Sequence, residues 1–449
     1  MHGAPLLRLL IVGLGTLVVP LDSMVNVAFP AITTHFAIPI ADIQWVVIPY
    51  VLAQSSLLLA FGRLGDMLGY RRIFLLGSAW SAAALLLCAL APGYGWLLLA
   101  RVAQGIGAGL LLSCGPALAT QLFPEAMRPR VLGLYTMMWA LGGALGPVLA
   151  GLLVARWGWA SVYAARVPLA LLAFACAWAL PADRPEHHRQ PLDRSGAALL
   201  SLGIATLLLA LALLHRPLAT PLLLAGIGAA CLVVYWRRPH GAVAPIIDPA
   251  LFRLRGFSFI TLASIGLSFA GFAVLLLVPF YLARFTTVST PVAGLLLALS
   301  PLGTALGAPL AGALANRVSP RQMVAAGALA SALGLALLGL LGEQASLPLL
   351  AVAMLVQGIG AGVFQLAYFD VITATLPLSA RGVAGSLGML SRSVGLVAGA
   401  SLLILVFQTL RRGDPGPAAF LAGFHGAVLL AAAVAAALLL GVGRLAPRR

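Results

Sequence analysis

The chain is built from long runs of apolar residues, and these runs constrain its fold more than any other feature. A run of about 18 or more apolar residues can cross a membrane as a helix, because about 20 residues span a hydrocarbon core of roughly 30 Å. Within lipid each backbone N–H and C=O group needs an internal partner, and the alternating pattern of a barrel strand is absent. We therefore predict an all-α integral membrane protein with fourteen transmembrane helices, at residues 9–30, 43–61, 73–94, 95–120, 131–155, 157–180, 196–214, 218–236, 257–282, 290–314, 323–342, 347–373, 383–408 and 417–441.

The composition excludes a soluble protein. Hydrophobic residues make up 62% of the 449 residues and charged residues only 8%, whereas about a quarter of a typical soluble protein is charged. The net charge of +16 comes from arginines scattered between the apolar runs, so it does not indicate a nucleic-acid site. The four cysteines lie inside apolar runs without CxxC spacing, and we expect neither a disulfide nor a metal site.

The arginines predict how the chain is oriented in the membrane. With the N-terminus in the cytoplasm, 19 arginines fall in cytoplasmic segments, 5 on the opposite face and 3 within the spans. Cytoplasmic loops carry an excess of basic residues. We therefore expect a multi-pass protein of the cytoplasmic (inner) membrane with both termini in the cytoplasm.

An internal repeat divides the chain into two halves. Residues 104–109 recur unchanged as residues 357–362, and the same offset of 253 maps Gly142 onto Gly395. Both copies begin in the cytoplasm, so the repeat is parallel and predicts two six-helix bundles that alternate access to a site between them. The expected domains are an N-terminal bundle at 1–181, a linker with two extra helices (196–214 and 218–236) at 182–256, and a C-terminal bundle at 257–449.

The loop between the second and third predicted spans reads GRLGDMLGYRR. Its glycines supply a tight turn between closely packed helices, and Asp66 can pair with the neighbouring arginines or with a helix N-terminus. Because opening would break such pairs, they would favour one state of a cytoplasmic gate. The alternative is the ordinary positive charge of a cytoplasmic loop. The candidate gate residues are Gly62, Arg63, Gly65, Asp66, Gly69, Arg71 and Arg72.

A charged residue at the centre of a span costs about 2.5–3.5 kcal/mol, so embedded charges are candidates for function. From the rise per residue, Asp22 lies roughly 12 Å below the outer end of the first span and Arg101 roughly 9 Å below the outer start of the fourth. The two are therefore expected at similar depth in one bundle. A nearby cation favours the carboxylate and desolvation favours the acid. We expect Asp22 to carry a proton and Arg101 to tune it; the alternative is a structural ion pair.

Three other embedded charges have weaker support. Asp370 and Arg392 lie in the cytoplasmic halves of spans twelve and thirteen, where we expect a second charge pair with a structural, gating or transport role. Arg166 lies near the outer third of the sixth span, and we expect its long side chain to snorkel to the membrane surface.

Small residues in the fifth span predict a close helix contact. Gly142 and Gly146 are four residues apart and Pro147 follows. Small residues let helix backbones approach, and proline kinks a helix. Close packing at the interface between the bundles would block a leak path for protons. The alternative is a generic packing motif.

The substrate cavity is expected to be apolar with a few polar groups, which suits amphipathic organic compounds. The polar or aromatic residues of the helices expected to line it are Asn26, Tyr50, Gln54, Trp139, Gln365, Tyr368 and Phe369. For any single one of these residues, ordinary packing or a lipid-interface position is favoured over a substrate contact.

Four stretches together resemble the major facilitator superfamily and, within it, the fourteen-helix branch of drug:proton antiporters. The loop at 62–72 resembles the superfamily's loop motif, and residues 21–30 resemble the branch's first-helix motif. Residues 101–109 resemble the fourth-helix motif, and residues 141–151 resemble the fifth-helix antiporter motif, which includes Gly151. The likeness covers nearly the whole chain. The chain departs from the family at Arg166, where an asparagine is usual.

The resemblance implies a secondary transporter that exports amphipathic organic compounds or drugs in exchange for protons. The expected partners are a small organic substrate, protons and membrane lipid, without nucleic acid. The proton motive force supplies the energy, and no cofactor is expected. A proton-coupled uptake permease for a small metabolite is the alternative, and a membrane sensor or scaffold is a third. An enzyme is disfavoured because the sequence lacks a Walker loop, an HExxH motif and an acyl-transfer elbow.

Overall fold

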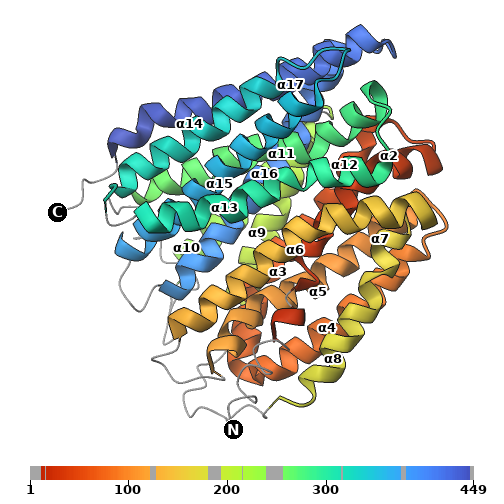
Figure 1. Cartoon of the computed structure of the whole chain (residues 1–449). Helices are drawn as coiled ribbons and strands as arrows, with labels where there is room; N and C mark the ends of the chain where they lie inside the picture. The colour runs from red at the N-terminus through yellow and green to blue at the C-terminus, as the bar shows by residue number, and fades with distance from the viewer. Residues whose placement is uncertain are drawn as a thin grey trace. The chain divides into compact units, whose positions relative to one another are not determined.

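The computed structural model describes the chain at residues 12–15, 17–121, 128–180, 194–214, 216–238, 256–314, 317–375 and 381–444. In these ranges every regular element is a helix, and Figure 1 shows the helices coloured in chain order. The predicted all-α class is therefore confirmed for the described residues.

The chain divides into two compact units, Met1–Leu209 with Leu222–Ile246, and Ala210–Pro221 with Ile247–Arg449. The elements that lie wholly or mainly in the first unit are η1 (Pro20–Ser23), α2 (Met24–His35), η2 (Ile40–Ile43), α3 (Gln44–Leu68), α4 (Tyr70–Ala89), α5 (Tyr94–Gln121), α6 (Arg128–Trp157), α7 (Ser161–Ala164), α8 (Arg166–Ala177), α9 (Arg194–Ala212) and α10 (Ala219–Arg237). Those of the second unit are α11 (Phe257–Phe285), α12 (Thr290–Leu297), α13 (Leu299–Leu314), α14 (Pro320–Leu338), α15 (Leu347–Thr375), α16 (Arg381–Arg411), α17 (Pro417–Ala437) and η6 (Leu438–Arg444).

Twelve helices of the described part are long and apolar enough to cross a membrane, and each overlaps one predicted span. The other two predicted spans are helical but do not meet this criterion. Residues 43–61 lie mostly in α3, and residues 157–180 contain α7 and α8, whose combined apolar stretch Ser161–Ala177 is too short. Large apolar side chains such as Leu99 and Leu222 remain exposed on the helix surfaces, which fits contact with lipid. The chain is therefore a multi-pass membrane protein, and the count of fourteen spans is not confirmed.

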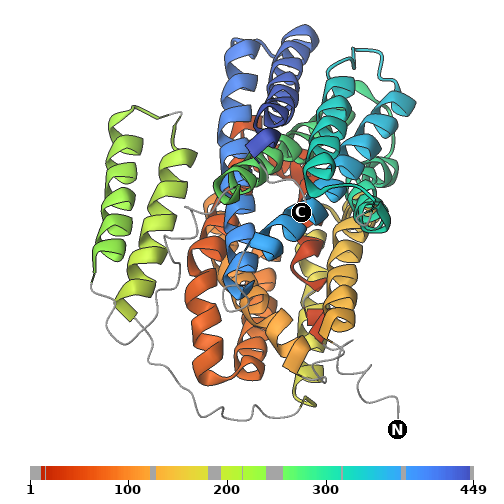
Figure 2. The same cartoon turned by 90° about the vertical axis from the view of Figure 1, so that its left-hand side faces the viewer.

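Helices α9 and α10 pack against each other as a pair, seen in yellow-green in Figure 2. A side-chain carbon added at Gly203 would lie 3.1 Å from Leu232, so the absence of a side chain lets the two helices approach. The pair corresponds to the predicted spans 196–214 and 218–236. The expected separation of these helices into a linker domain stays a prediction.

The two copies of the sequence repeat pack in the same way inside their own units. Helix α5 packs against α3 and α4 in the first unit, and α15 packs against α13 and α14 in the second. A side-chain carbon added at Gly105 would meet the carbonyl of Tyr50, and one at Gly358 would meet the carbonyl of Ser300. The second glycine of the string repeats the pattern, with Gly107 against Ser81 in the first unit and Gly360 against Ser331 in the second. The glycines of the repeated string are therefore sites where backbones approach closely.

Gly69 forms the turn between α3 and α4. Its φ of 96° and ψ of 137° lie in a region that side chains rarely adopt, because a Cβ would be strained there. Its N–H donates to the carbonyl of Gly65 at 2.9 Å and closes the end of α3. The tight glycine turn predicted for the loop is confirmed at Gly69.

We predict that Gly69→Ala destabilises the protein by about 1–3 kcal/mol, the usual cost of a strained backbone conformation. The measurement is the free energy of unfolding in mixed detergent micelles. Gly62→Ala is the matched control, because a side-chain carbon at Gly62 meets nothing within 4 Å. Equal stability of the two variants would show that the turn is not specified by Gly69.

Candidate functional site

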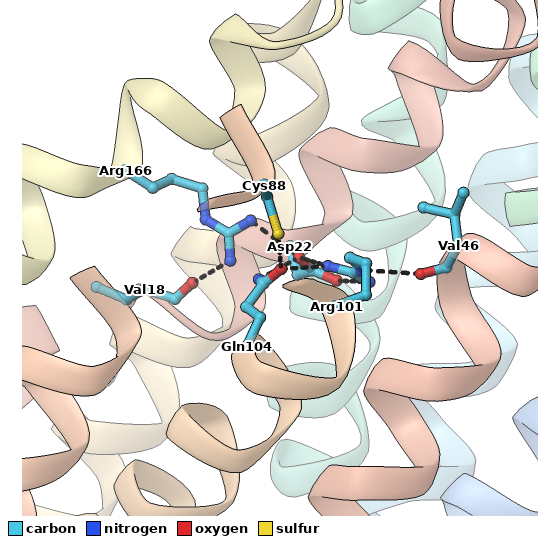
Figure 3. Close-up of polar contacts among 7 residues, drawn as sticks. All are labelled: Val18, Asp22, Val46, Cys88, Arg101, Gln104 and Arg166. Atoms are coloured by element: carbon cyan, nitrogen blue, oxygen red, sulfur yellow. Dashed lines mark hydrogen bonds and ion pairs between the residues drawn. The ribbon is translucent and has the colours of Figure 1, made fainter. Parts of the chain in front are cut away.

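A carboxylate and two arginines meet inside the first unit, in the region drawn in Figure 3. Asp22 lies in the 3-10 turn η1, which begins at Pro20 and passes directly into α2 at Met24. The Asp22 N–H donates to the carbonyl of Val19 at 2.9 Å. The first span therefore changes from α-helix to a 3-10 turn at the level of its acidic residue, and nearby carbonyls can accept bonds from side chains.

Arg101 holds the carboxylate with both terminal nitrogens of its guanidinium group. Its Nη1 donates to Asp22 Oδ1 at 2.7 Å, and its Nη2 donates to Oδ2 at 2.8 Å. Its Nε donates to the carbonyl of Val46 on α3 at 2.6 Å. Such paired bonds fix both distance and orientation. The ion pair confirms the expectation that Asp22 and Arg101 lie at similar depth in one bundle.

Arg166, the first residue of α8, is a second cation on the same carboxylate. Its Nη1 donates to Asp22 Oδ1 at 2.8 Å, and its Nη2 donates to the carbonyl of Val18 at 2.8 Å. Only 2% of the Arg166 side chain is exposed. The prediction that Arg166 snorkels to the membrane surface is therefore wrong, because its side chain points from the start of α8 into the unit.

Gln104 completes the polar cluster from one turn further along α5. Its Nε2 donates to Asp22 Oδ1 at 2.9 Å, and its Oε1 accepts from Arg101 Nη1 at 2.6 Å. The ring of Tyr50 lies 4.3 Å from the guanidinium carbon of Arg101, a cation–π contact. We call Asp22, Arg101, Arg166 and Gln104 the carboxylate cluster. Gln104 was identifiable from the sequence only as a residue three positions after Arg101, on the same helix face.

The carboxylate cluster carries one negative and two positive charges. Arg101 is 1% exposed and Asp22 is 15% exposed, so the carboxylate is its most accessible charged member. Among the described residues, Asp22 is the one carboxylate within ion-pair distance of either guanidinium. A buried charge is stable only when paired. The cluster therefore ties η1, α5 and α8 together and keeps an excess of one positive charge.

Comparisons with known proteins agree with this architecture. The sequence profile of the Major Facilitator Superfamily matches residues 12–278 and 258–449. The chain belongs to this superfamily. It is 28% identical over 404 residues to the riboflavin transporter RibZ of Clostridioides difficile, covering 89% of this chain and 87% of that protein.

A second relative is the puromycin resistance protein pur8 of Streptomyces alboniger, which is 32% identical over 399 residues, 86% of this chain and 78% of that protein. Among solved structures, a POT family transporter in complex with a thioalcohol-conjugated peptide has a TM-score of 0.74 at 15% identity, covering 97% of this chain and 95% of that one. This likeness shows the shared fold. The chain is therefore a membrane transporter rather than an enzyme.

The glycines of the fifth-helix motif in this transporter pack against the turn that carries the acid. A side-chain carbon at Gly142 would lie 2.7 Å from Pro20 Cγ, and one at Gly146 would collide with Ser23 Oγ. The Ser23 hydroxyl donates to the carbonyl of Gly143 at 3.2 Å. Helix α6 thus supports η1 on both sides of Asp22. Pro147 and Gly151 lie buried further along α6, and the predicted sealing of a leak path between bundles stays a prediction.

The predicted gate loop is linked to the cluster through α8. Arg71 donates from Nη2 to the carbonyl of Trp178 at 2.8 Å and from Nε to that of Ala177 at 3.3 Å, which satisfies carbonyls at the end of α8. Arg72 is exposed. The side chains of Arg63 and Asp66 lie outside the described part of the chain, so the predicted pairing of Asp66 stays a prediction.

The other predicted site residues are distributed over several helices. Tyr50 lies beside Arg101, as described above, and Tyr368 is buried. A cavity with room for about one water molecule lies next to Tyr50 and Gln104. Asp370 is half-buried on α15 and Arg392 is exposed on α16, and their pairing stays a prediction. Half-buried or exposed positions are occupied by the remaining candidates, Asn26, Gln54, Trp139, Gln365 and Phe369.

We predict that Asp22→Asn destabilises the folded state by about 3–5 kcal/mol, because it leaves two buried guanidinium groups without a carboxylate. Arg166→Gln should cost only about 1–3 kcal/mol, because it leaves a one-to-one pair between Asp22 and Arg101. Equilibrium unfolding in mixed micelles measures both values. Arg156→Gln, at an exposed position on α6, is the control and should change stability by less than about 0.5 kcal/mol. A larger cost for Arg166→Gln than for Asp22→Asn would contradict the charge excess.

We predict that Gly142→Ala lowers stability by about 1–3 kcal/mol, because the new methyl group would press on Pro20. Gly143→Ala is the matched control on the next residue. A side-chain carbon there meets nothing within 4 Å, and alanine favours the helix more than glycine does. The apparent melting temperatures of the two purified variants test the contact, and indistinguishable values would refute it.

Proposed function

We propose that this transporter exports amphipathic organic compounds across the cytoplasmic membrane in exchange for protons, by alternating access driven by the proton motive force. We further propose fourteen membrane helices, with α3 and the α7–α8 segment as the two additional spans and both termini in the cytoplasm. The relatives named for riboflavin transport and for puromycin resistance support an organic cargo. The arginine bias of the loops supports the orientation.

The observation that carries the proposal is a partly exposed carboxylate whose hydrogen bonds and ion pairs compete with the binding of a proton. Asp22 accepts bonds from two guanidinium groups and one amide in the described conformation. For Asp22 to bind a proton, at least one of these donors must withdraw, since a neutral acid cannot balance their charge. Movement of α8 relative to η1 would separate Arg166 from Asp22. Protonation and a change of access are thereby coupled.

The packing of α6 on η1 supports a role for α6 in proton coupling. The glycines at 142 and 146 contact the residues that flank Asp22, so a tilt of α6 would move the carboxylate against its arginines. A proton-coupled uptake permease for a small metabolite is the second candidate, because the carboxylate cluster supports proton coupling in either direction of transport. The two candidates differ in which face of the membrane the cargo enters from.

We predict that Asp22→Asn abolishes proton-coupled transport. Everted membrane vesicles are energised, and riboflavin or puromycin is added while the internal pH and cargo uptake are recorded. Wild-type vesicles should accumulate cargo and release protons from the lumen, and Asp22→Asn should lower both by at least about tenfold, the effect of losing an essential proton group. Asp414→Asn, at an exposed acid, should behave as wild type.

The outcomes separate the alternatives. Unchanged proton release with Asp22→Asn would refute the carrier role. Proton-coupled accumulation only in right-side-out vesicles would favour the uptake permease. If Asp22→Asn does not reach the membrane, Asp22→Glu replaces it, because it keeps a titratable group at a shifted position. Asp22→Glu should retain coupling at a reduced rate.

A further inference from the structure

Arg166, the second arginine of the carboxylate cluster, has one donor atom that its contacts with Asp22 and Val18 leave without a partner among the described residues. Arg166 shares Asp22 with Arg101, so the cluster holds one more positive charge than negative charge. The Nε atom of Arg166 is buried and has no hydrogen-bond partner among the described residues. A buried donor without a partner costs about 1–3 kcal/mol. This donor therefore indicates a missing acceptor beside Arg166.

Arg166 also lines a small cavity. It is lined by Arg166 together with Tyr50, Ser81 and Gln104, and by the apolar residues Val18, Val19, Leu85 and Ala108. The polar side chains of this lining offer a guanidinium, two hydroxyls and an amide, all of which can donate hydrogen bonds. None of the lining residues is acidic. The space suits an occupant of about the size of one water molecule.

We propose that this cavity is a binding site for a single small monovalent anion, with chloride as the physiological class of ligand. The anion would accept the free Nε–H of Arg166 and balance the excess guanidinium charge. A water molecule could fill the space but would leave that charge unbalanced. The site lies within the first unit and does not depend on the direction of transport or on the identity of the cargo.

The charge arithmetic links this site to Asp22. With Asp22 ionised, the cluster has a net charge of +1, and an anion restores neutrality. With Asp22 neutral, the net charge is +2, and the attraction for an anion increases. The anion is thus bound more tightly when the carboxylate loses its charge. When Asp22 is neutral, a chloride ion would supply part of the negative charge that the carboxylate no longer provides to the two arginines.

The test is chloride binding by the purified full-length protein in detergent, independent of any transport assay. The apparent melting temperature is recorded while chloride or bromide replaces gluconate at constant ionic strength, because a ligand that binds the folded state raises this temperature. For the wild type we expect a saturable rise with both halides and none with gluconate, which is too large for the cavity. Arg166→Gln should lose at least about nine-tenths of the halide effect, and Arg156→Gln should keep it.

Asp22→Asn gives the opposite expectation. The half-saturating chloride concentration should fall by at least about tenfold, since the variant removes a negative charge near the site. If Arg166→Gln does not fold, Arg166→Lys keeps the charge without the Nε donor and should weaken halide binding while leaving a measurable effect. No saturable halide effect in the wild type, an equal effect in Arg166→Gln, or weaker binding in Asp22→Asn would each overturn the proposal.

Discussion

One carboxylate shared by two buried guanidinium groups determines how the first unit is arranged. Three separate segments supply its charges, and a fourth supplies the carbonyl of Val46 that Arg101 also binds. Because an unpaired charge is unstable in this environment, η1, α5 and α8 cannot shift independently while Asp22 is ionised. Helix α6 supports η1 through its glycines, and Arg71 binds the far end of α8. The glycines of α6 and Arg71 of the loop at 62–72 are therefore both linked to Asp22, through contacts with η1 and α8 respectively.

The depth of a charge in a helix could be predicted from the sequence, and its direction around the helix axis could not. The similar depth of Asp22 and Arg101 follows from counting residues at a constant rise, whereas their contact depends on the direction of each side chain around its helix axis. Arg166 lies on a helix that begins at that residue, after the α7 turn, so its side chain points inward although its position suggested the membrane surface. The resemblance to the family did not predict the inward direction of Arg166 either, because the family usually has asparagine at this position.

One of the two differences between the predicted and the observed spans, at residues 157–180, has a local cause. Gly158 adopts a φ of 75°, which ends α6 and separates it from α7. The apolar run at 157–180 therefore begins with a turn and two short helices rather than with one continuous helix. Apolarity alone predicts that a segment lies in lipid. The interruption depends on backbone angles at one glycine and on the contacts of Arg166.

The matched glycine contacts in the two units show which part of a duplicated protein can diverge. At the offset that relates Gln104 to Gln357, Arg101 corresponds to Met354, which is fully buried and apolar. Gln357 binds Ser300 instead of an acid. Both copies have close backbone contacts at these glycines. At the level of Arg101, the first copy has an embedded charge and the second has an apolar residue. The two copies therefore share a close-packed glycine scaffold and differ in the embedded charge that the scaffold surrounds.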